Sequence, residues 1–145
     1  MRYYRDIEIR FRDLDALGHV NNVVYLTYVE QSRIGYFNEV IAEKYDWTKV
    51  GVLLARSEIN YLKPVVMTDT VKCGLECIRI GNKSLDFSFK IFRQNKDGWD
   101  EVASGTNVLV SYDHKINQSV AIPVEWKPEL KTLKMNTYLF KARSS

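Results

Sequence analysis

The residues best suited to chemistry lie in one short stretch, residues 13–22, with the sequence DLDALGHVNN. The stretch contains two carboxylates, a glycine, a histidine and two amides, and a long, mostly apolar helical pattern follows it directly. The start of a helix offers free backbone N–H groups and the positive end of the helix dipole. An acid and an oxyanion-binding site can therefore lie side by side at this point.

Each of these side chains could have a structural role instead of a chemical one. Asp15 could be a catalytic carboxylate, but aspartate also favours turns whatever the function. His19 could be a base, a ligand group or a hydrogen-bonded loop residue. Asn21 or Asn22 could cap the helix through its side-chain oxygen. Spacing alone leaves these alternatives open.

The elements around this stretch must hold it in place. Residues 3–12 alternate between apolar and charged side chains, with Phe11 on the apolar side, which predicts a half-buried first strand. We expect a helix to begin near Asn22 and to run to about residue 44. Its apolar residues fall on more than one face, so we expect the rest of the chain to surround it. Gly35 inside this helix suggests a close approach by another backbone.

Four further strands follow in the pattern. We expect them at residues 52–62, 68–80, 84–92 and 99–112. Turns containing Gly81-Asn82 and Asp97-Gly98 separate the last three, which predicts an antiparallel meander. Beyond Ser119, two prolines precede an apolar pattern at residues 129–140, where we expect a short capping helix.

Alternation places sets of residues on common faces of the last three strands. The sets are Val71, Cys73, Leu75 and Cys77; Leu85, Phe87, Phe89 and Ile91; and Val102, Ser104, Thr106, Val108, Val110 and Tyr112. Two cysteines four apart in one strand are separated by about 13 Å, too far for a disulfide. We therefore expect Cys73 and Cys77 to be small core residues in a reducing compartment.

The composition indicates one domain and excludes some partners. A chain of 145 residues with 46% hydrophobic content supports one core. The net charge of +3 comes from 21 basic and 18 acidic residues scattered along the chain, which fits a phosphate-bearing small ligand better than nucleic acid. We find no apolar run near 18 residues and no charged-then-apolar leader, so we expect a cytoplasmic protein without membrane association.

A long helix after one strand, followed by an antiparallel run, predicts a curved sheet wrapped around that helix. This layout and the D-x-D-x-x-G-H-V-N-N run resemble the hotdog-fold acyl-CoA thioesterases of the 4-hydroxybenzoyl-CoA thioesterase type. Tyr25, Tyr28, Glu30 and Arg33, and later YLKP at 61–64 and TDTV at 68–71, add to the resemblance. It covers residues 3–112 and implies an α+β hotdog fold. We expect a single hotdog thioesterase domain over residues 1–145, with a core at 3–112 and a C-terminal extension at 119–145.

The resemblance also implies roles within residues 13–22. In similar enzymes the second aspartate of the D-x-D pair attacks the thioester carbonyl or activates water for that attack, and this position is Asp15. Backbone N–H groups at the helix start polarise the carbonyl, which points to Asn22. We expect His19 to position the substrate or the loop, and Asp13 to be structural. A thioester is a reactive acyl donor, so no metal or organic cofactor is needed.

Other polar residues receive weaker assignments. Glu30 and Arg33, three apart on the helix, can pair and tie it to a partner strand or subunit. Basic side chains should line the channel for the coenzyme A phosphates. The candidates are Arg56, Lys63, Arg79 and Lys83. Ser84 lies where similar proteins often carry a small hydroxyl residue near bound coenzyme.

The sequence thus predicts a thioester hydrolase acting on acyl-CoA or an acyl-carrier-protein ester. The resemblance implies a homodimer or homotetramer with active sites at subunit boundaries. A non-hydrolytic acyl-thioester binding protein and a hotdog enoyl-CoA hydratase or dehydratase are the alternatives. A G-x-S-x-G elbow is missing, and Asp13, Asp15 and His19 lack a further metal ligand nearby. The acyl group stays open: aromatic, short and long chains are all compatible.

Overall fold

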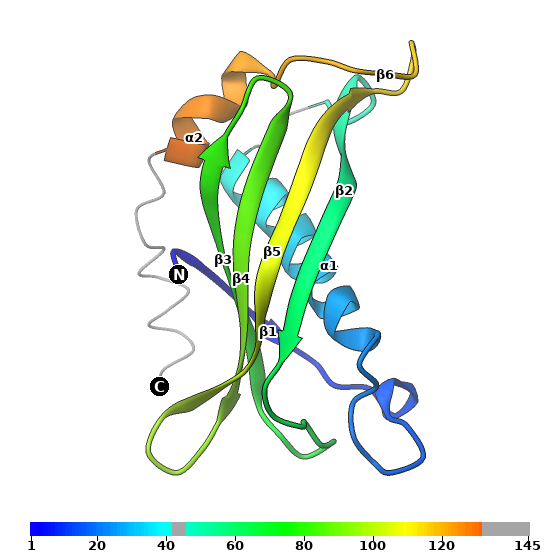
Figure 1. Ribbon diagram of the computed structural model, residues 1–145. Coiled ribbons are helices and arrows are strands. Elements are labelled where there is room, and N and C mark those ends of the chain that lie inside the picture. The colour runs from blue at the N-terminus through cyan, green and yellow to red at the C-terminus, as the bar shows by residue number, and fades with distance from the viewer. Residues whose placement is uncertain (42–45, 132–145) are drawn as a thin grey trace.

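The computed structural model describes residues 1–41 and 46–131 (Figure 1). The strands are β1 (Tyr3–Ile7), β2 (Val50–Tyr61), β3 (Val71–Ile80), β4 (Ser84–Gln94), β5 (Trp99–Asp113) and β6 (Gln118–Ser119). The main helix is α1 (Val24–Tyr36), which continues as one π-helical segment, η2 (Phe37–Ile41). Shorter helical segments are η1 (Phe11–Asp13), η3 (Val124–Trp126) and α2 (Lys127–Lys131). None of these helices is long and apolar enough to span a membrane.

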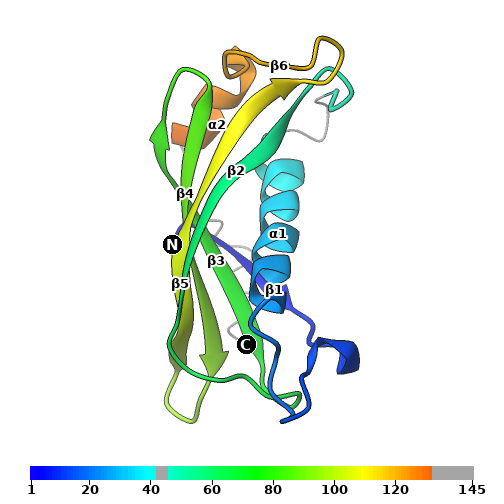
Figure 2. The same ribbon diagram turned by 45° about the vertical axis from the view of Figure 1, so that its right-hand side comes forward.

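The strands form one antiparallel sheet in the order β1-β3-β4-β5-β2, and β6 pairs with β5. The predicted meander of three hairpin-connected strands is confirmed as β3-β4-β5. β1 and β2 lie at opposite edges, so the segment that joins them must cross the sheet. That segment is α1, which lies against one face of the curved sheet (Figure 2). This is the wrapped helix that the sequence predicts.

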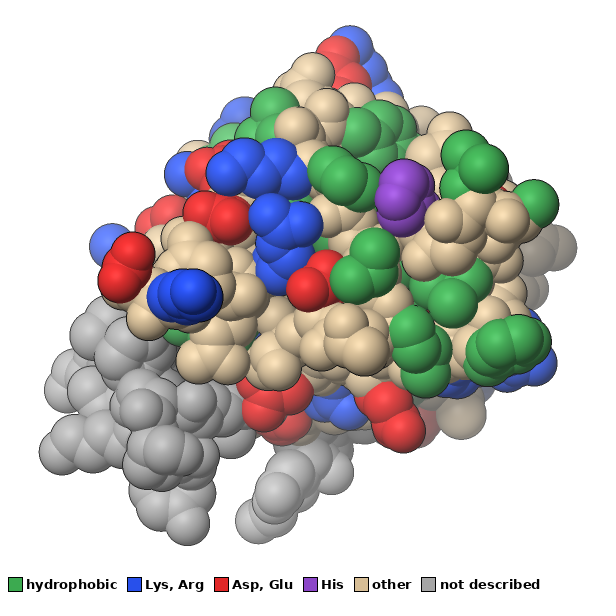
Figure 3. Space-filling model, turned by 90° about the horizontal axis from the view of Figure 1, so that it is seen from below, with side chains coloured by type: hydrophobic (Ala, Val, Ile, Leu, Met, Phe, Trp, Pro, Cys, Tyr) green, Lys and Arg blue, Asp and Glu red, His purple; other side chains and the backbone are tan. Residues whose placement is uncertain are grey.

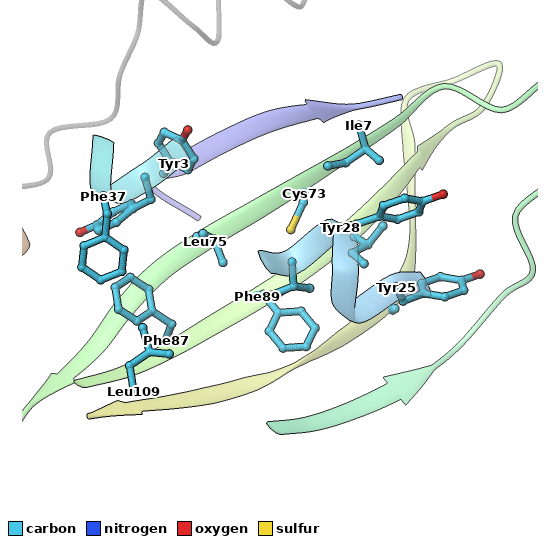
Figure 4. Packing of buried hydrophobic residues seen from close by; sticks show 14 of the residues in the cluster. Tyr3, Ile7, Tyr25, Tyr28, Phe37, Cys73, Leu75, Phe87, Phe89 and Leu109 are labelled. Carbon is cyan, nitrogen blue, oxygen red and sulfur yellow. The ribbon is translucent and has the colours of Figure 1, made fainter. Parts of the chain in front are cut away.

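The core lies between α1 and the inner face of the sheet (Figure 4). The predicted inward sets of β3 and β4 are confirmed, because Cys73, Leu75, Phe87 and Phe89 are fully buried. Helical side chains pack on them, including Tyr28, Val29 and Tyr36. Burial of this apolar surface is the main term that stabilises the fold.

Gly35 is the point where α1 comes nearest to β1. A Cβ built at this position would lie 2.5 Å from Arg5 Nη1 and 2.7 Å from Tyr3 Oη. The close approach expected at Gly35 is present, but side chains of β1 make it, not a backbone. A larger residue here would push the helix away from the strand.

The first strand is shorter than predicted. β1 ends at Ile7, where its pairing with β3 ends, and the chain then turns into η1. The Asp13 carboxylate accepts a hydrogen bond from Arg10 N at 2.9 Å, which stabilises this turn. Phe11 therefore leaves the strand pattern and is 83% exposed. The α-helix is also shorter than predicted, because it changes to π-helix at Phe37, and residues 42–45 lie outside the described part.

The face assigned to β5 is wrong over most of its length. The residues that face the core are Ala103, Asn107, Leu109 and Ser111, so the predicted set from Ser104 to Tyr112 lies on the outer face. The pairing register between β4 and β5 shifts after the Ile91–Ala103 pair, because Phe92 pairs with Glu101. One extra residue at such a bulge exchanges the two faces of a strand.

The C-terminal segment covers one end of the core. Trp126 is fully buried, and its ring centroid lies 5.8 Å from that of Phe37. The predicted capping helix begins earlier than expected, at Lys127, and most of the range 129–140 lies outside the described residues. Both cysteines are free, with Cys73 buried and Cys77 partly buried, as the spacing predicts.

Candidate functional site

Residues 13–21 form a narrow loop at one end of the sheet. Asn21 N donates to Asp13 O at 2.8 Å, and Asp15 N donates to His19 O at 2.7 Å. Gly18, with φ of +79°, supplies the left-handed residue that closes the turn. The backbone itself therefore holds Asp15 and His19 opposite one another.

Asp15 is exposed, and only one of its carboxylate oxygens is engaged. Oδ1 accepts hydrogen bonds from Leu17 N at 2.9 Å and from His19 N at 3.2 Å. Oδ2 has no hydrogen-bond partner among the residues that the structure describes. The turn role of Asp15 is confirmed by these two hydrogen bonds, and its chemical role stays a prediction. One oxygen fixes the side chain, and the other can face a ligand.

Asp13 has the opposite environment, although it lies only two residues away. It is 2% exposed and accepts hydrogen bonds from Tyr28 Oη at 2.8 Å and from Arg10 N at 2.9 Å. Arg10 Nη2 adds a contact of 3.3 Å to the same carboxylate. Burial alone raises the pKa of Asp13, but the donors from Arg10 and Tyr28 outweigh it and lower the pKa. Asp13 therefore anchors the loop as a buried carboxylate.

Tyr28 is a residue of this site that sequence reasoning did not connect with Asp13. Burial and then its hydrogen bond to Asp13 raise the pKa of Tyr28, so the phenol stays protonated and donates. The apolar helical pattern gave Tyr28 a packing role, and nothing in the spacing shows that its hydroxyl reaches a residue 15 positions earlier. Figure 4 shows Tyr28 and Tyr25 leaving α1 toward the same end of the core.

The start of α1 presents a free backbone donor at Asn22. Asn21, not Asn22, uses its side chain here, because its Oδ1 accepts from Val23 N at 3.2 Å. Asn22 O accepts from Tyr61 Oη at 2.9 Å, and Asn22 N has no acceptor within residues 1–41 and 46–131. The Tyr61 contact fixes the peptide that precedes the helix. It is a second contact that sequence reasoning missed.

A second segment, residues 62–70, supports the loop from the side. Val20 N donates to Val65 O at 2.8 Å, and His19 forms a β-bridge with Val66. Arg93 Nη1 donates to Pro64 O at 2.6 Å and ties this segment to β4. The main chain of His19 is thus fixed on both sides.

Hydrophobic side chains reach the surface around this loop. They are Phe11, Leu17, Val23, Tyr61, Leu62, Val66 and Met67. Figure 3 shows this end of the molecule, where hydrophobic side chains are interspersed with charged ones. Apolar surface beside an exposed carboxylate suits a ligand that has both an apolar part and a polar, reactive part.

Arg33 does not pair with Glu30 as predicted. Its Nη1 donates to Asn107 Oδ1 at 3.0 Å, and Asn107 Nδ2 donates to Ser57 Oγ at 2.9 Å. Burial lowers the pKa of Arg33, and the nearby charge of Glu30 opposes that shift. The residue does tie the helix to strands, in this case β5 and β2. The bulge that turns Asn107 inward explains why the sequence did not show this partner.

The basic candidates for coenzyme phosphates do not gather at the loop. Lys63 pairs with Asp100, and Arg56 pairs with Glu58. The group made up of Arg79, Lys83 and Ser84 lies at the β3–β4 hairpin, at the other end of the sheet in Figure 1. Arg79 is held there, because its Nε donates to Asp86 at 2.8 Å and its Nη2 donates to Ser84 Oγ at 2.8 Å. These three residues lie far from the Asp15 of their own chain. Within residues 1–41 and 46–131 no group of three His, Cys, Asp or Glu side chains could hold a metal ion.

Comparisons with known proteins agree with this architecture. The family model described as "Thioesterase-like superfamily" matches residues 9–132. The long-chain acyl-CoA thioesterase FadM of Escherichia coli (strain K12) is 24% identical over 130 residues, covering 88% of this chain and 96% of FadM.

Two solved structures are similar over nearly the whole chain. One is a Thermus thermophilus thioesterase complexed with coenzyme A and zinc, 31% identical, with a TM-score of 0.78 and coverage of 91% and 93%. The other is the PA5185 protein of Pseudomonas aeruginosa PAO1, 28% identical, with a TM-score of 0.80 and coverage of 93% and 94%. The prediction of an α+β hotdog fold is confirmed.

Proposed function

Because the chain belongs to the thioesterase-like superfamily, we propose that it hydrolyses an acyl thioester to a free acid and a thiol at the 13–22 loop. The observation that carries the proposal is Asp15, an exposed carboxylate with one oxygen held by two backbone N–H groups and the other unengaged among the described residues. The neighbours named as a long-chain acyl-CoA thioesterase and as a thioesterase bound to coenzyme A favour acyl-CoA as the substrate.

In this proposal Asp15 Oδ2 either removes a proton from water or itself attacks the carbonyl carbon. In the first route the hydroxide adds to the carbon, the carbon–sulfur bond breaks, and the leaving thiolate takes up a proton. In the second route an acyl-aspartyl anhydride forms and water then cleaves it. Both routes consume one water and give the same products. A carboxylate fixed through one oxygen fits either role.

The carbonyl oxygen gains negative charge in both routes, and Asn22 N is our candidate donor for it. This N–H precedes α1 and lacks an acceptor in the described part of the chain. The positive end of the α1 dipole lies at the same place and favours an oxyanion. We assign His19 to substrate positioning, because its backbone N–H holds Asp15 and its ring makes no hydrogen bond to a described residue. Asp13 supports the loop through Tyr28 and takes no part in the chemistry.

We further propose that the protein acts as a homodimer joined through β2, with a tetramer as a further step of assembly. β2 lies at an edge of the sheet, where no second strand from the described residues pairs with it, and two of its apolar residues, Leu53 and Leu54, are 42% and 50% exposed. Edge strands of this kind are templates for pairing with another chain. We place the enzyme in the cytoplasm, in keeping with its free cysteines. We retain the 4-hydroxybenzoyl-CoA thioesterase type as the proposed subtype, because the 13–22 sequence resembles that type.

The test is thiol release from a panel of aromatic, short-chain and long-chain acyl-CoA esters. Asp15→Asn should lower kcat/KM about 100-fold or more, because the base or nucleophile is removed. The new amide oxygen can still accept from Leu17 N and His19 N, so the loop should keep its shape. Asp97→Asn is the matched control, since Asp97 is exposed in the β4–β5 turn and should not affect turnover.

Two results would contradict the proposal. If Asp15→Asn kept full activity across the panel, the assignment of the base or nucleophile would be wrong. If the wild-type protein were stabilised against heat by acyl-CoA but released no thiol, it would be an acyl-thioester binding protein. Parallel assays with acyl-carrier-protein esters decide whether coenzyme A or acyl carrier protein carries the acyl group.

A further inference from the structure

A cavity of about 320 Å³ lies between α1, η2 and the start of β2. Its walls are largely apolar, formed by Ile34, Phe37, Trp47 and Val52. Three polar residues complete the lining: the charged Glu30 and Arg33 of α1, and the exposed Asn38 of η2. A cavity of this size with apolar walls and few polar groups is typical of a small-molecule site.

Arg33 is the unusual member of this lining. It is 9% exposed, and its guanidinium has one hydrogen-bond partner among the described residues, Asn107, which accepts from Nη1. A guanidinium carries five N–H donors, and a buried charge is costly unless acceptors satisfy it. No carboxylate within residues 1–41 and 46–131 forms a salt bridge with Arg33. The remaining N–H donors therefore lack an acceptor among the described residues, and the cavity is the open space beside them.

Glu30 supplies an acceptor at the same cavity. It lies one helical turn before Arg33 and is exposed, with no hydrogen bond to Arg33. A hydroxyl group can accept from a guanidinium and donate to a carboxylate at the same time. A carboxylate on the ligand could accept from Arg33 but would be repelled by Glu30. The pair thus matches a neutral hydroxyl better than an anion.

We infer that this cavity binds the far end of the acyl group, and that Arg33 selects acyl groups carrying a hydroxyl distant from the thioester. The inference rests on the proposed function, because it names the substrate class of that reaction. It makes Arg33 a specificity-determining residue. The aromatic and aliphatic walls enclose the hydrocarbon next to the hydroxyl.

The distance along α1 from the loop to the cavity determines which acyl chain lengths to test. Eleven residues separate Asn22 from Arg33, which corresponds to about 16 Å at the helical rise. An extended chain advances about 1.2 Å per bond, so an acyl group starting at the loop of the same subunit needs about a dozen carbons. In a homodimer joined through β2, the 13–22 loop of the second subunit offers another starting point for the acyl group. A shorter acyl chain then suffices to reach the cavity. The panel must therefore contain a medium and a long chain.

The experiment compares kcat/KM for octanoyl-CoA and dodecanoyl-CoA with that for their ω-hydroxy and ω-carboxy derivatives. For at least one chain length the wild-type protein should prefer the ω-hydroxy ester about tenfold or more, as a hydrogen bond to a charged group allows. Arg33→Gln should abolish this preference. Ile34→Trp should also abolish it, because it fills the cavity from an exposed position and leaves the buried Arg33–Asn107 contact in place.

Gln31→Trp is the matched control, because Gln31 is exposed on the same helix and does not line the cavity. This control should keep the preference, and sedimentation should show the same oligomeric state for all variants. The inference is overturned if neither chain length shows a preference, if Ile34→Trp retains it, or if the ω-carboxy ester is preferred. If no ester is hydrolysed, the proposed hydrolase function is wrong, and this result does not test the cavity. Calorimetry with ω-hydroxy and plain fatty acids then tests the cavity alone, with the same preference expected.

Discussion

The hydrogen bond from Tyr28 to Asp13 offers a direct test of how the loop is anchored. Tyr28→Phe removes one hydroxyl and leaves a buried carboxylate with its donors from Arg10 only. A buried hydrogen bond to a charged acceptor contributes about 1.5–3 kcal/mol. For a chain of 145 residues each kcal/mol corresponds to roughly 2–4 °C in Tm. We therefore expect Tm to fall by about 3–12 °C.

Tyr36→Phe is the matched control for this change. Tyr28 and Tyr36 both belong to α1, and both side chains are fully buried. The hydroxyl of Tyr36 has no hydrogen-bond partner in the described part of the chain. Its removal relieves an unsatisfied polar group, so Tyr36→Phe should leave Tm unchanged or raise it. Urea denaturation of both variants gives the two free energies of unfolding.

The pH dependence of the same pair has a defined sign. The pKa of Asp13 is lowered in the folded protein, so its stabilising contribution is present above the unfolded pKa. That contribution is lost as pH falls through the folded pKa. The difference in unfolding free energy between wild type and Tyr28→Phe should therefore be largest near neutral pH and should shrink in acid. Equal destabilisation by Tyr28→Phe and Tyr36→Phe, or a difference that grows in acid, would refute the anchoring role of Asp13.

Two further predictions concern β2. A Cβ added at Gly105 would lie 1.9 Å from Glu58 O, so Gly105→Ala should separate β5 from β2. Overpacking of about 1–3 kcal/mol should lower Tm by about 2–12 °C. Gly51→Ala is the control, because a Cβ at Gly51 would meet only the side chain of His114. An unchanged Tm for Gly105→Ala would contradict the close pairing of β5 with β2 at this position. If the proposed homodimer forms through β2, the double change Leu53→Glu and Leu54→Glu should shift sedimentation toward monomer. A double variant with the wild-type dimer mass would place the interface elsewhere.

The sequence was informative where a local period decides the structure. Alternation identified β3 and β4 and their inward residues, because each lies in a hairpin with buried residues at every second position. The turns at Gly81 and Gly98 fixed the order of the meander. These features depend on neighbours a few residues apart, and such patterns can be read without the tertiary structure.

The errors came from interactions between residues distant in the chain or from single extra residues. The bulge in β5 exchanges the faces between Val102 and Ala103, and no local composition marks it. Arg33 finds Asn107 74 positions later, so helical spacing suggested Glu30 instead. Phe11 fits an alternating pattern, but the buried Asp13 carboxylate holds the chain in a turn at that point. That turn is held by a hydrogen bond between residues three apart, but the burial of Asp13 also depends on Tyr28, 15 positions later.

The two aspartates show why the candidate site needed a structure. They are the same residue type two positions apart, and the sequence could rank them only through resemblance. In the fold, Asp13 is buried against Tyr28, whereas Asp15 is exposed with one oxygen fixed by the turn. A buried carboxylate that already accepts three hydrogen bonds cannot reach a carbonyl carbon, so of the two aspartates we propose Asp15 for the chemistry. The contacts that saturate Asp13 hold the base of the turn on which Asp15 lies, so the buried acid serves the exposed one by fixing its position.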